Sequence, residues 1–470
     1  MTDTISSTPL PHFTVDDRVA RGKEARSETP RSVLGEWSAG DDRPDPVDLL
    51  EEQAASRVPD LVPIRYGRML VSPFTFYRGA AYLMASDMSR FPKTSLRVQL
   101  CGDAHLSNFG GYSAPDRRLV FDMNDFDETL PGPFEWDVKR LITSFEVAGR
   151  SRGFSPAERE RINLTVARSY REAMTRYSEM RLFDVWYSRI DVEDLVRLTK
   201  DLSPAALKRF EKNVAKARTK DSLSAFNKLT QIVDGEPRFI SNPPLVVPAH
   251  ELYGRTTEEV IEHTRHLIRA YRHTLPNDRQ HLLEGFRFVD LARKVVGVGS
   301  VGTRAWIALF VGRDGTDPLV LQIKEAQASV LETFVGKSGF ANHGQRVVEG
   351  QRLMQAASDL MLGWVRAEGV DGIERDFYVR QLWDSKASAL VDVMGARTMG
   401  FYAEICGETL ARAHARSGDS VAIASYLGSS KTFERGMAAF ASAYADQNER
   451  DYEALKRAAE FGRIEVQSGL

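Results

Sequence analysis

Cysteine is scarce in this sequence, and so are long apolar runs. The two cysteines, Cys101 and Cys406, are too few for a framework of several disulfides or for a four-cysteine zinc site. No stretch approaches the roughly 18 uncharged residues that a membrane-spanning helix needs. Residues 1–30 also lack the apolar centre of a signal peptide. We therefore expect a soluble protein of the reducing cytoplasm, with no membrane partner.

An excess of charge of one sign is also missing. The 470 residues include 63 Lys and Arg against 65 Asp and Glu, a formal net charge of −2. Without a basic field, binding to nucleic acid or to an anionic membrane is not indicated. A hydrophobic fraction of 42% and a charged fraction of 27% are typical of globular proteins. The length predicts about two to four domains, or one large two-lobed unit.

Local patterns predict where strands and helices alternate. Two short strands, Leu96–Leu100 and Arg118–Asp122, precede loops rich in Asp and Asn. Residues 140–285 are typical of helices, as are the residues after Ala396. Between these regions, β-branched residues and glycines predict three antiparallel strands, an amphipathic helix and a further strand. Their ranges are Lys294–Val298, Arg304–Val311, Leu319–Ile323, Gln345–Leu362 and Phe377–Leu382.

Acidic and amide side chains gather on the two loops that follow the first two strands. On the first loop, Asp103 can point a carboxylate at a substrate hydroxyl while the Asn108 amide oxygen reaches a metal ion. On the second, Asp125 could share that metal, and Asp122 and Asp127 crowd the same place. Carboxylates this close repel one another, and a divalent cation relieves the repulsion. Together the loops favour a metal site over turn capping, the alternative that either loop alone would allow.

A glycine-rich hairpin lies farther along the chain. The glycines of its G-x-G-x-x-G motif are Gly297, Gly299 and Gly302. A dinucleotide-binding loop would stand between a strand and a helix, whereas this motif stands between two predicted strands. A glycine-rich hairpin over phosphates, with a Lys on the third strand, is the kinase arrangement, and Lys324 has that place. Such a Lys needs a carboxylate partner; Glu349 is the first candidate and Glu332 the second. A plain hairpin turn and a solubilising edge-strand Lys are the alternatives.

Several of these motifs resemble those of the aminoglycoside and choline phosphotransferases, a branch of the kinase-like enzymes. Cys101–Asn108 is similar to their H-G-D-x-H-x-x-N catalytic loop, with Cys101 in place of the usual His. Asp125-Phe-Asp resembles their metal-binding D-[FW]-x motif. Asp137 resembles the Asp that opens the next helix and braces the catalytic loop, and Leu410-Ala-Arg-Ala-His414 resembles the L-A-x-x-H helix that precedes that loop.

This resemblance implies a role for each matching residue. Asp103 would be the catalytic base or would orient the acceptor hydroxyl, and Asn108 and Asp125 would be Mg²⁺ ligands. Lys324 would hold the α- and β-phosphates of ATP, and Glu349 would hold Lys324.

The order of the motifs is permuted relative to ordinary kinases, in which the glycine-rich loop and the Lys precede the catalytic loop. The resemblance therefore implies an α+β, protein-kinase-like, two-lobed fold that is circularly permuted, with a large helical lobe and a small antiparallel-sheet lobe. Permutation is tolerated where chain termini lie on the surface. The expected divisions are a flexible N-terminal arm, the part of the helical lobe with the catalytic and metal loops, a helical region, the sheet lobe, and the C-terminal helices of the helical lobe. Their ranges are 1–45, 46–150, 151–285, 286–392 and 393–470.

The chain from about residue 30 to residue 455 also resembles an uncharacterised bacterial family, domain of unknown function 2252. The matching stretches include Ser72-Pro-Phe-Thr-Phe-Tyr-Arg-Gly79, Phe121–Arg140 and Gly344–Leu353. From the motifs we expect an ATP- and Mg²⁺-dependent phosphotransferase acting on a hydroxyl or amine of a small-molecule acceptor. The alternatives are a nucleotide-binding regulatory pseudokinase, an AMP-transferring enzyme and a metal-dependent phosphoesterase.

Three further side chains have competing interpretations. Arg78 could touch a phosphate or an acidic substrate, or it could brace a loop. His105 is expected to brace its own loop instead of acting as the base. Cys101 begins a buried junction between strand and loop, where a packing thiol is favoured over a nucleophile.

Overall fold

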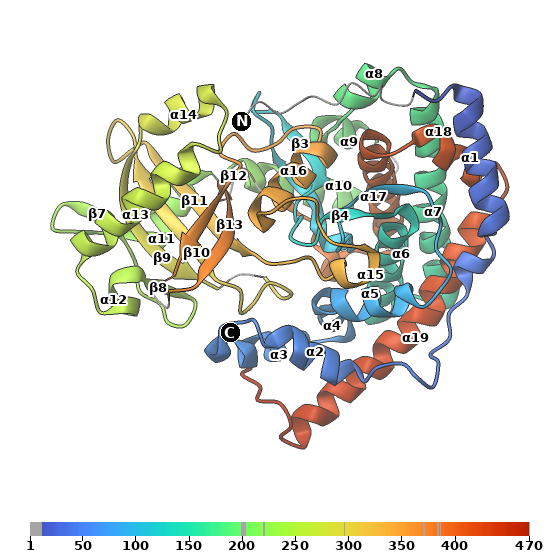
Figure 1. Ribbon diagram of the computed structural model, residues 1–470, viewed down its shortest axis with the longest axis horizontal. Coiled ribbons are helices and arrows are strands. Elements are labelled where there is room, and N and C mark those ends of the chain that lie inside the picture. Colours follow the sequence, from blue (N-terminus) through green and yellow to red (C-terminus); the bar gives the residue numbers. More distant parts are fainter. Residues whose placement is uncertain are drawn as a thin grey trace.

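The computed structural model describes residues 12–198, 204–219, 221–295, 297–369, 372–382, 385 and 387–469. A body of helices lies beside a six-stranded antiparallel sheet (Figure 1). Among the described helices, none combines the length and the apolar character that crossing a membrane requires. The expectation of an α+β protein with antiparallel sheets is confirmed.

Four long helices form the centre of the helical body. They are α6 (Phe134–Ser151), α7 (Pro156–Glu179), α17 (Ala396–Ser417) and α19 (Thr432–Glu460). Ser155 and Glu158 close a capping box at the start of α7, as the Ser-Pro-x-Glu sequence predicts. Residues 134–149 of α6 are all buried, so α6 lies at the core of the body. Shorter helices here are α8 (Leu182–Tyr187), α9 (Val192–Leu198), α10 (Pro204–Arg218) and α18 (Ser420–Leu427).

The N-terminal segment is more ordered than the sequence predicted. The expectation of a flexible arm over residues 1–45 is wrong for Val15–Glu28, which form helix α1; residues 1–11 lie outside the described part. Thr14 and Asp17 close a capping box that begins the helix. Gly22 lets α1 approach α18 closely, because a Cβ there would lie 2.1 Å from the Ala422 carbonyl oxygen. Close contact with α18 thus offsets the ordering cost of a largely polar helix.

A chain of short helices then leads to the first strand. Their bounds are η1 (Val33–Gly35), α2 (Pro46–Ala54), η2 (Pro59–Leu61), α3 (Val62–Met69), α4 (Pro73–Gly79) and α5 (Ala81–Ser89). Apolar side chains of α2, α3 and α4 pack against the end of α19. This contact joins the beginning of the chain to its C-terminal helix.

Two small sheets carry the loops rich in Asp and Asn. One pairs β1 (Arg97–Leu100) with β4 (Leu130–Pro133). The other has the order β14-β2-β3-β5, and its bounds are β14 (Ala387–Ser388), β2 (Phe109–Ser113), β3 (Leu119–Met123) and β5 (Ile190–Asp191). The first loop runs from β1 through η3 (Leu106–Asn108) to β2, and the second runs from β3 to β4. The two predicted strands are confirmed.

The large sheet has the order β12-β13-β11-β10-β9-β8. Its strands are β8 (Val246–Pro248), β9 (Arg287–Lys294), β10 (Ala305–Val311), β11 (Pro318–Ala326), β12 (Gly363–Glu368) and β13 (Glu374–Gln381). Of the three antiparallel strands predicted around the glycine-rich hairpin, Arg304–Val311 and Leu319–Ile323 are confirmed by β10 and β11. The strand predicted over Lys294–Val298 is wrong, because β9 ends at Lys294 and Gly297 turns the chain with a φ of +72°. Val296 lies outside the described residues.

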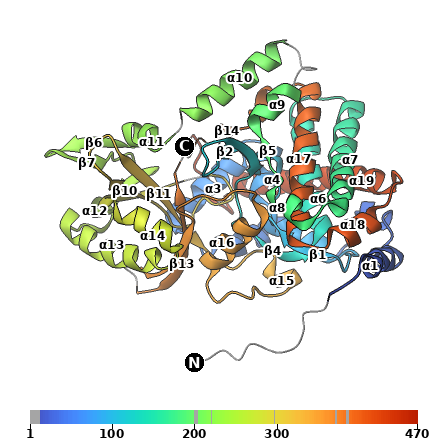
Figure 2. The ribbon, with the colours of Figure 1, turned by 90° about the horizontal axis from the view of Figure 1, so that it is seen from above.

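Helices from the middle of the chain cover both faces of this sheet. Helix α11 (Ser222–Leu229) packs on one face, and α12 (Ala249–Tyr253), α13 (Thr257–Arg272) and α14 (Asn277–Glu284) lie on the other (Figure 2). The hairpin of β6 (Thr230–Val233) and β7 (Glu236–Phe239) adjoins β9. β8 and these helices, which precede residue 286, therefore pack with the sheet.

Helix α16 (His343–Met354) lies between the sheet and the helical body. It ends eight residues before the predicted end at Leu362 because the next groups bond to β3 instead. Gln355 Nε2 donates to the Met123 carbonyl at 2.7 Å, and the Ala356 N–H donates to Asp122 at 3.1 Å. The remaining short helices are α15 (Glu332–Val335) and η5 (Val391–Val393).

Candidate functional site

Two adjoining cavities lie between the large sheet and the loops of the helical body. The larger, of about 490 Å³, is lined by five predicted site residues: Asp103, Asn108, Asp125, Gly297 and Gly299. The smaller, of about 240 Å³, is lined by Lys324 and shares Asp125 and Gly297 with the first. Among the described residues that line them, Gly302 and Glu349 do not appear. The fold thus brings six of the eight predicted residues to one place.

The first of the two Asp/Asn loops is held by a buried carboxylate. Asp137, in the first turn of α6, accepts hydrogen bonds from the backbone N–H groups of Cys101 and Gly102 at 2.6 and 3.0 Å. His414 of α17 places Nε2 3.3 Å from the same carboxylate. Gly102 has a φ of +85°, and a Cβ there would lie 2.2 Å from the Glu128 carbonyl oxygen, so this turn requires glycine. The brace that the resemblance implied for Asp137 is present.

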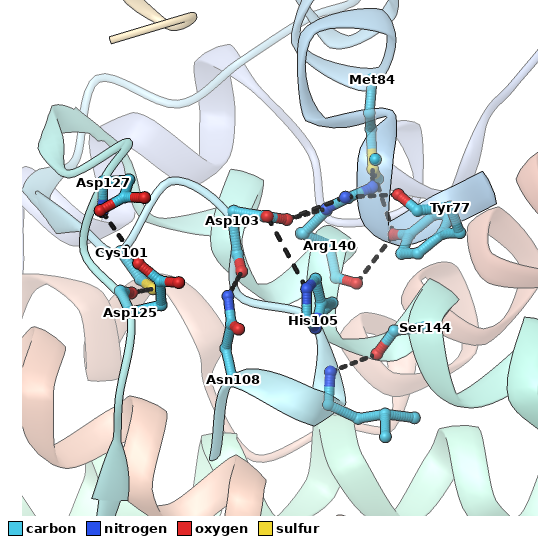
Figure 3. Close-up of polar contacts among 12 residues, drawn as sticks. Tyr77, Met84, Cys101, Asp103, His105, Asn108, Asp125, Asp127, Arg140 and Ser144 are labelled. Carbon is cyan, nitrogen blue, oxygen red and sulfur yellow. Dashed lines mark hydrogen bonds and ion pairs between the residues drawn. The ribbon is translucent and has the colours of Figure 1, made fainter. Parts of the chain in front are cut away.

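Asp103 lines the cavity and is steadied by a buried cation. Arg140 Nε donates to Asp103 Oδ1 at 2.8 Å, and the Arg140 guanidinium lies 3.9 Å over the Tyr77 ring (Figure 3). Burial raises the pKa of Asp103, and Arg140 opposes that rise. His105 Nε2 lies 3.8 Å from Asp103 Oδ2, but burial lowers the pKa of His105 well below its usual value. His105 is therefore a weaker base than an ordinary imidazole, in keeping with the expectation that it does not act as the base.

Hydrogen bonds join the two Asp/Asn loops to each other. Asn108 Nδ2 donates to the Asp103 carbonyl at 2.6 Å, and the Asn124 N–H donates to the Asn108 carbonyl at 2.8 Å. Cys101 Sγ donates to the Asp125 carbonyl at 3.1 Å. Burial raises the pKa of the Cys101 thiol well above its usual value, so the thiol stays protonated and is a donor instead of a nucleophile. Cys101, which stands where the phosphotransferase motif usually has His, thus helps to join the two loops.

Asn108 and Asp125 offer a small set of hard oxygen ligands. Because the Asn108 amide nitrogen is committed to Asp103, the amide acceptor that a cation could use is Oδ1. Mg²⁺ is commonly held by one or two protein oxygens together with substrate phosphates. Within the described part of the chain, no group of three or more His, Cys, Asp or Glu residues could hold a metal ion. Asn108 and Asp125 therefore remain the predicted ligands of a metal ion, and other ligands would have to complete its coordination.

Asp122 was counted with this acidic cluster from the sequence, and that prediction is wrong. Its carboxylate pairs with Arg412, and both side chains are about 1% exposed. The second oxygen accepts the Ala356 N–H at 3.1 Å. Asp122 still lies within β3, so the strand sets its direction, whereas Asp125 follows the end of the strand and lines the cavity. Asp122 joins β3 to α17 and to the end of α16.

Lys324 lies on β11 with its ammonium group among the carboxylates of the second loop. Nζ is 2.5 Å from Asp127 Oδ2 and 3.7 Å from Asp125 Oδ1, and the side chain is 2% exposed. The Tyr378 hydroxyl donates to the other Asp127 oxygen at 2.6 Å. Burial by itself would lower the pKa of Lys324, but Asp125 and Asp127 raise it above its usual value. The sheet therefore presents a fixed positive charge to the second loop.

The carboxylate partner predicted for this lysine is wrong. Glu349 pairs with Arg352 on the same helix at 3.2 Å, and Glu332 lies 4.0 Å from Arg346. Asp127 occupies the place that Glu349 was expected to fill. Helix α16 contributes Arg346 instead, which is buried and donates to the Asp127 carbonyl at 2.8 Å. Helix α16 thus supports the second loop through a backbone carbonyl of that loop, and the loop in turn holds Lys324.

The glycine-rich loop is tied to the N-terminal segment, a contact that the sequence did not predict. Three donors bond to carbonyl oxygens of the loop: Arg57 to Val301, Val58 to Gly302 at 2.8 Å, and Arg68 to Gly297 at 2.6 Å. Gly302 has a φ of +92°, and a Cβ there would lie 3.0 Å from the Arg57 Cβ. Gly302 is therefore required by the turn and by this contact. The paired segments are more than 200 residues apart, which no local pattern signals.

Arg78 is a cavity residue for which the sequence left two roles open. It lies on α4 and lines the larger cavity together with Asp103 and Asp125. Its Nε is buried and has no hydrogen-bond partner in the part of the chain that the structure describes. Burial lowers the pKa of Arg78, and the two carboxylates oppose that shift. A cation with an unused donor thus lies on the wall of the cavity.

Comparison with known proteins identifies the family. The chain matches the family described as "Uncharacterized protein conserved in bacteria (DUF2252)" over residues 57–458, and it therefore belongs to that family. No curated protein matches the chain. No solved structure matches it. Since the family description carries no activity, the function has to be argued from the geometry of the site.

Proposed function

We propose that the protein is an ATP- and Mg²⁺-dependent phosphotransferase that acts on a hydroxyl or amine of a small-molecule acceptor. The observation that carries this proposal is the meeting of Lys324 with Asp125 and Asp127 at 3.7 and 2.5 Å, beside Asp103 and Asn108. These residues come from the two halves of the chain. Separately, each set has an ordinary structural explanation, but their convergence on shared cavities supports a phosphate-transfer site.

The arrangement of the elements supports a permuted kinase-like fold. The glycine-rich loop joins β9 to β10, and Lys324 lies on β11 of the same antiparallel sheet. The loops with Asp103 and Asp125 belong to the helical body on the other side of the cavities. In the proposed fold the sheet would carry the nucleotide-binding groups and the helical body would carry the catalytic groups, in a circularly permuted order along the chain.

The nucleotide would be held by charge and by backbone groups. Asn108 Oδ1 and the Asp125 carboxylate would hold Mg²⁺, which when bound neutralises charge that develops on the phosphates. Lys324 would hold the α- and β-phosphates while Asp127 steadies its ammonium group. The glycine-rich loop would cover the phosphates, since Gly297 and Gly299 line the cavity without side chains to obstruct it.

Asp103 would act on the acceptor. Arg140 holds Oδ1, which leaves Oδ2 as the oxygen that can orient the acceptor hydroxyl. As the acceptor oxygen attacks the γ-phosphorus, its proton passes to Asp103 and the bond from that phosphorus to the leaving ADP oxygen breaks. Little further covalent work falls to the protein, because positioning and electrostatic stabilisation account for most of the catalysis of phosphoryl transfer.

A thermal-shift screen with ATP, GTP and ADP, each with and without Mg²⁺, tests this function. We expect stabilisation by ATP only when Mg²⁺ is present, because the protein supplies few metal ligands of its own. Mass analysis of the protein and of added acceptors then distinguishes phosphate transfer from AMP transfer. Melting that is independent of nucleotide would favour the phosphoesterase alternative, for which the glycine-rich hairpin and Lys324 have no use.

A further inference from the structure

A third cavity, of about 410 Å³, lies on the face of the large sheet opposite Lys324. The alternation of side chains along β11 separates the two sites. Gln322 and Lys324 point to the nucleotide side and line the smaller of the two catalytic cavities. Leu321 and Ile323 point the other way and line this third cavity, which α12 and α13 cover (Figure 2).

Most of this cavity is lined by aliphatic and aromatic side chains. Tyr253 and Trp306 stack along one wall, with ring centroids 5.9 Å apart. Two hydroxyl groups in the lining are already satisfied by the chain: Tyr271 donates to the Met361 carbonyl, and Thr264 to the Val260 carbonyl. Protein interiors are close-packed, and a space with few polar partners is a poor site for water. The lining therefore suits an apolar ligand.

One end of the cavity is basic. Arg293 is next to the last residue of β9, Arg304 precedes β10 and Arg375 is the second residue of β13. The antiparallel register therefore brings all three to the same end of the sheet. Glu325 takes up part of this charge, since it lies 3.2 Å from Arg304 and 3.8 Å from Arg375. Arg293 Nε is buried and has no hydrogen-bond partner among the described residues. The end of the sheet thus offers a donor that an anion could use.

We propose that this cavity binds an amphipathic acid, a molecule with an apolar chain and one terminal carboxylate. The chain would lie between α13 and the sheet, and the carboxylate would accept hydrogen bonds from Arg293 and its neighbours. The shape and the charge select this class together, because an apolar body fills the lined space and a single anion matches the basic end. Nothing in this proposal depends on nucleotide binding at the other face.

Calorimetric titration of the full chain with dodecanoate, below its micelle-forming concentration, tests the proposal. We expect one site per chain, and about tenfold weaker binding of dodecan-1-ol, which lacks the charge-assisted hydrogen bonds. Arg293→Met is expected to weaken dodecanoate binding about tenfold for the same reason. The matched control is Arg287→Met, at the exposed start of the same strand, which should leave the affinity unchanged.

Filling the cavity gives a second line of evidence. Ala308 and Ala367 both line it, from β10 and β12, so Ala308→Phe and Ala367→Leu each occupy part of the space. Circular dichroism shows which variant folds, and the folded one is expected to lose dodecanoate binding. Absence of binding to the wild-type chain, or undiminished binding to a folded filled variant, would overturn the proposal. Equal affinities for the acid and the alcohol would overturn the assignment of the basic end.

Discussion

The two walls of the candidate-site cavities are built in different ways. The wall with Asp103 and Asn108 is local: Asp137, within 40 residues of both, anchors the first loop through two backbone hydrogen bonds, at 2.6 and 3.0 Å. The wall with the glycine-rich loop depends on distant segments, since Arg57 and Arg68 reach it across more than 200 residues. The groups proposed to act on the acceptor thus have a local support, and the groups proposed to receive the nucleotide are positioned by contacts between distant segments.

This contrast has a physical reason. General acid–base chemistry requires the catalytic group to be held close to its productive geometry, which packed elements and buried hydrogen bonds achieve. A nucleotide must enter and leave, and a loop held through backbone carbonyls by arginine side chains can adjust without disturbing a hydrophobic core. Substitutions in the two walls are therefore expected to have different effects.

The largest effect is expected from Asp103→Ala on the local wall. Loss of the group that orients the acceptor and takes its proton is expected to lower kcat about 10²- to 10⁴-fold. Binding of Mg·ATP should remain, because Asp103 is not assigned to the nucleotide. Steady-state kinetics and calorimetry measure the two quantities. Asp116→Ala, at an exposed turn between β2 and β3, is the matched control. Undiminished turnover of Asp103→Ala would remove Asp103 from the mechanism.

Asp137→Ala should destabilise the loop that carries Asp103 and Asn108. The change leaves the N–H groups of Cys101 and Gly102 without their acceptor and removes the partner of His414. We expect a loss of about 2–5 kcal/mol in the free energy of unfolding, since buried unpaired donors are costly. Urea denaturation of the variant and the wild type measures the difference. A loss below about 0.5 kcal/mol, the size expected of a surface substitution, would show that the brace is unimportant.

Glu128 links the loop between β3 and β4 to the segment that follows β11, and its ionisation should weaken this contact. Its carboxylate accepts the Val330 N–H at 2.8 Å, and burial raises its pKa to about 7. Between pH 4.5, the usual value, and 7, the unfolded chain releases this proton while the folded chain keeps it, so stability falls as pH rises through that window. Well above pH 7, the loss of unfolding free energy caused by ionised Glu128 no longer changes with pH.

Glu128→Gln keeps the hydrogen bond to Val330 and cannot ionise. Relative to the wild type, we expect the variant to gain about 1–3 kcal/mol of unfolding free energy on going from pH 5 to pH 8. Urea denaturation of both proteins at the two pH values measures this gain and cancels the contributions of other groups. A difference that does not change with pH would contradict the raised pKa.

Gly302→Ala tests the wall with the glycine-rich loop and should have the smallest effect. A side chain at a φ of +92° is strained, and its Cβ would press on Arg57. The expected loss is about 1–2 kcal/mol of unfolding free energy, together with a higher KM for ATP and an unchanged kcat. Gly315→Ala, in an open turn with no atom near the added Cβ, is the control. A fall in kcat at constant KM would place the loop in the chemical step.

Local sequence patterns predicted the parts of the site whose geometry is local. The strands before Asp103 and Asp125 follow from local patterns, whereas the brace by Asp137 followed from the resemblance to the phosphotransferases. The partner of Lys324 could not be predicted in this way. Either Asp127 or Glu349 could supply the carboxylate that Lys324 needs, as far as the sequence shows. Which of the two faces Lys324 depends on how α16 and the loop between β3 and β4 pack against β11.

The remaining errors arise where distant contacts override a local pattern. Residues 15–28 are largely polar, yet they form α1 because Gly22 permits a close contact with α18. The capping box of Thr14 and Asp17 is the signal that could have revealed this helix. The valines after Lys294 favour a strand, but the glycine-rich loop bonds to Arg57 and Arg68 and leaves the sheet.

Calorimetric titration of Mg·ATP into the wild type and into Lys324→Met tests the central claim, that both walls form one nucleotide site. The wild type is expected to bind one ATP per chain only with Mg²⁺, and Lys324→Met to bind it at least about tenfold more weakly, because a charge-assisted contact to phosphate is lost. Lys456→Met, on the exposed side of α19, should bind as the wild type does. Equal affinities of Lys324→Met and the wild type, or no binding by either, would contradict the account.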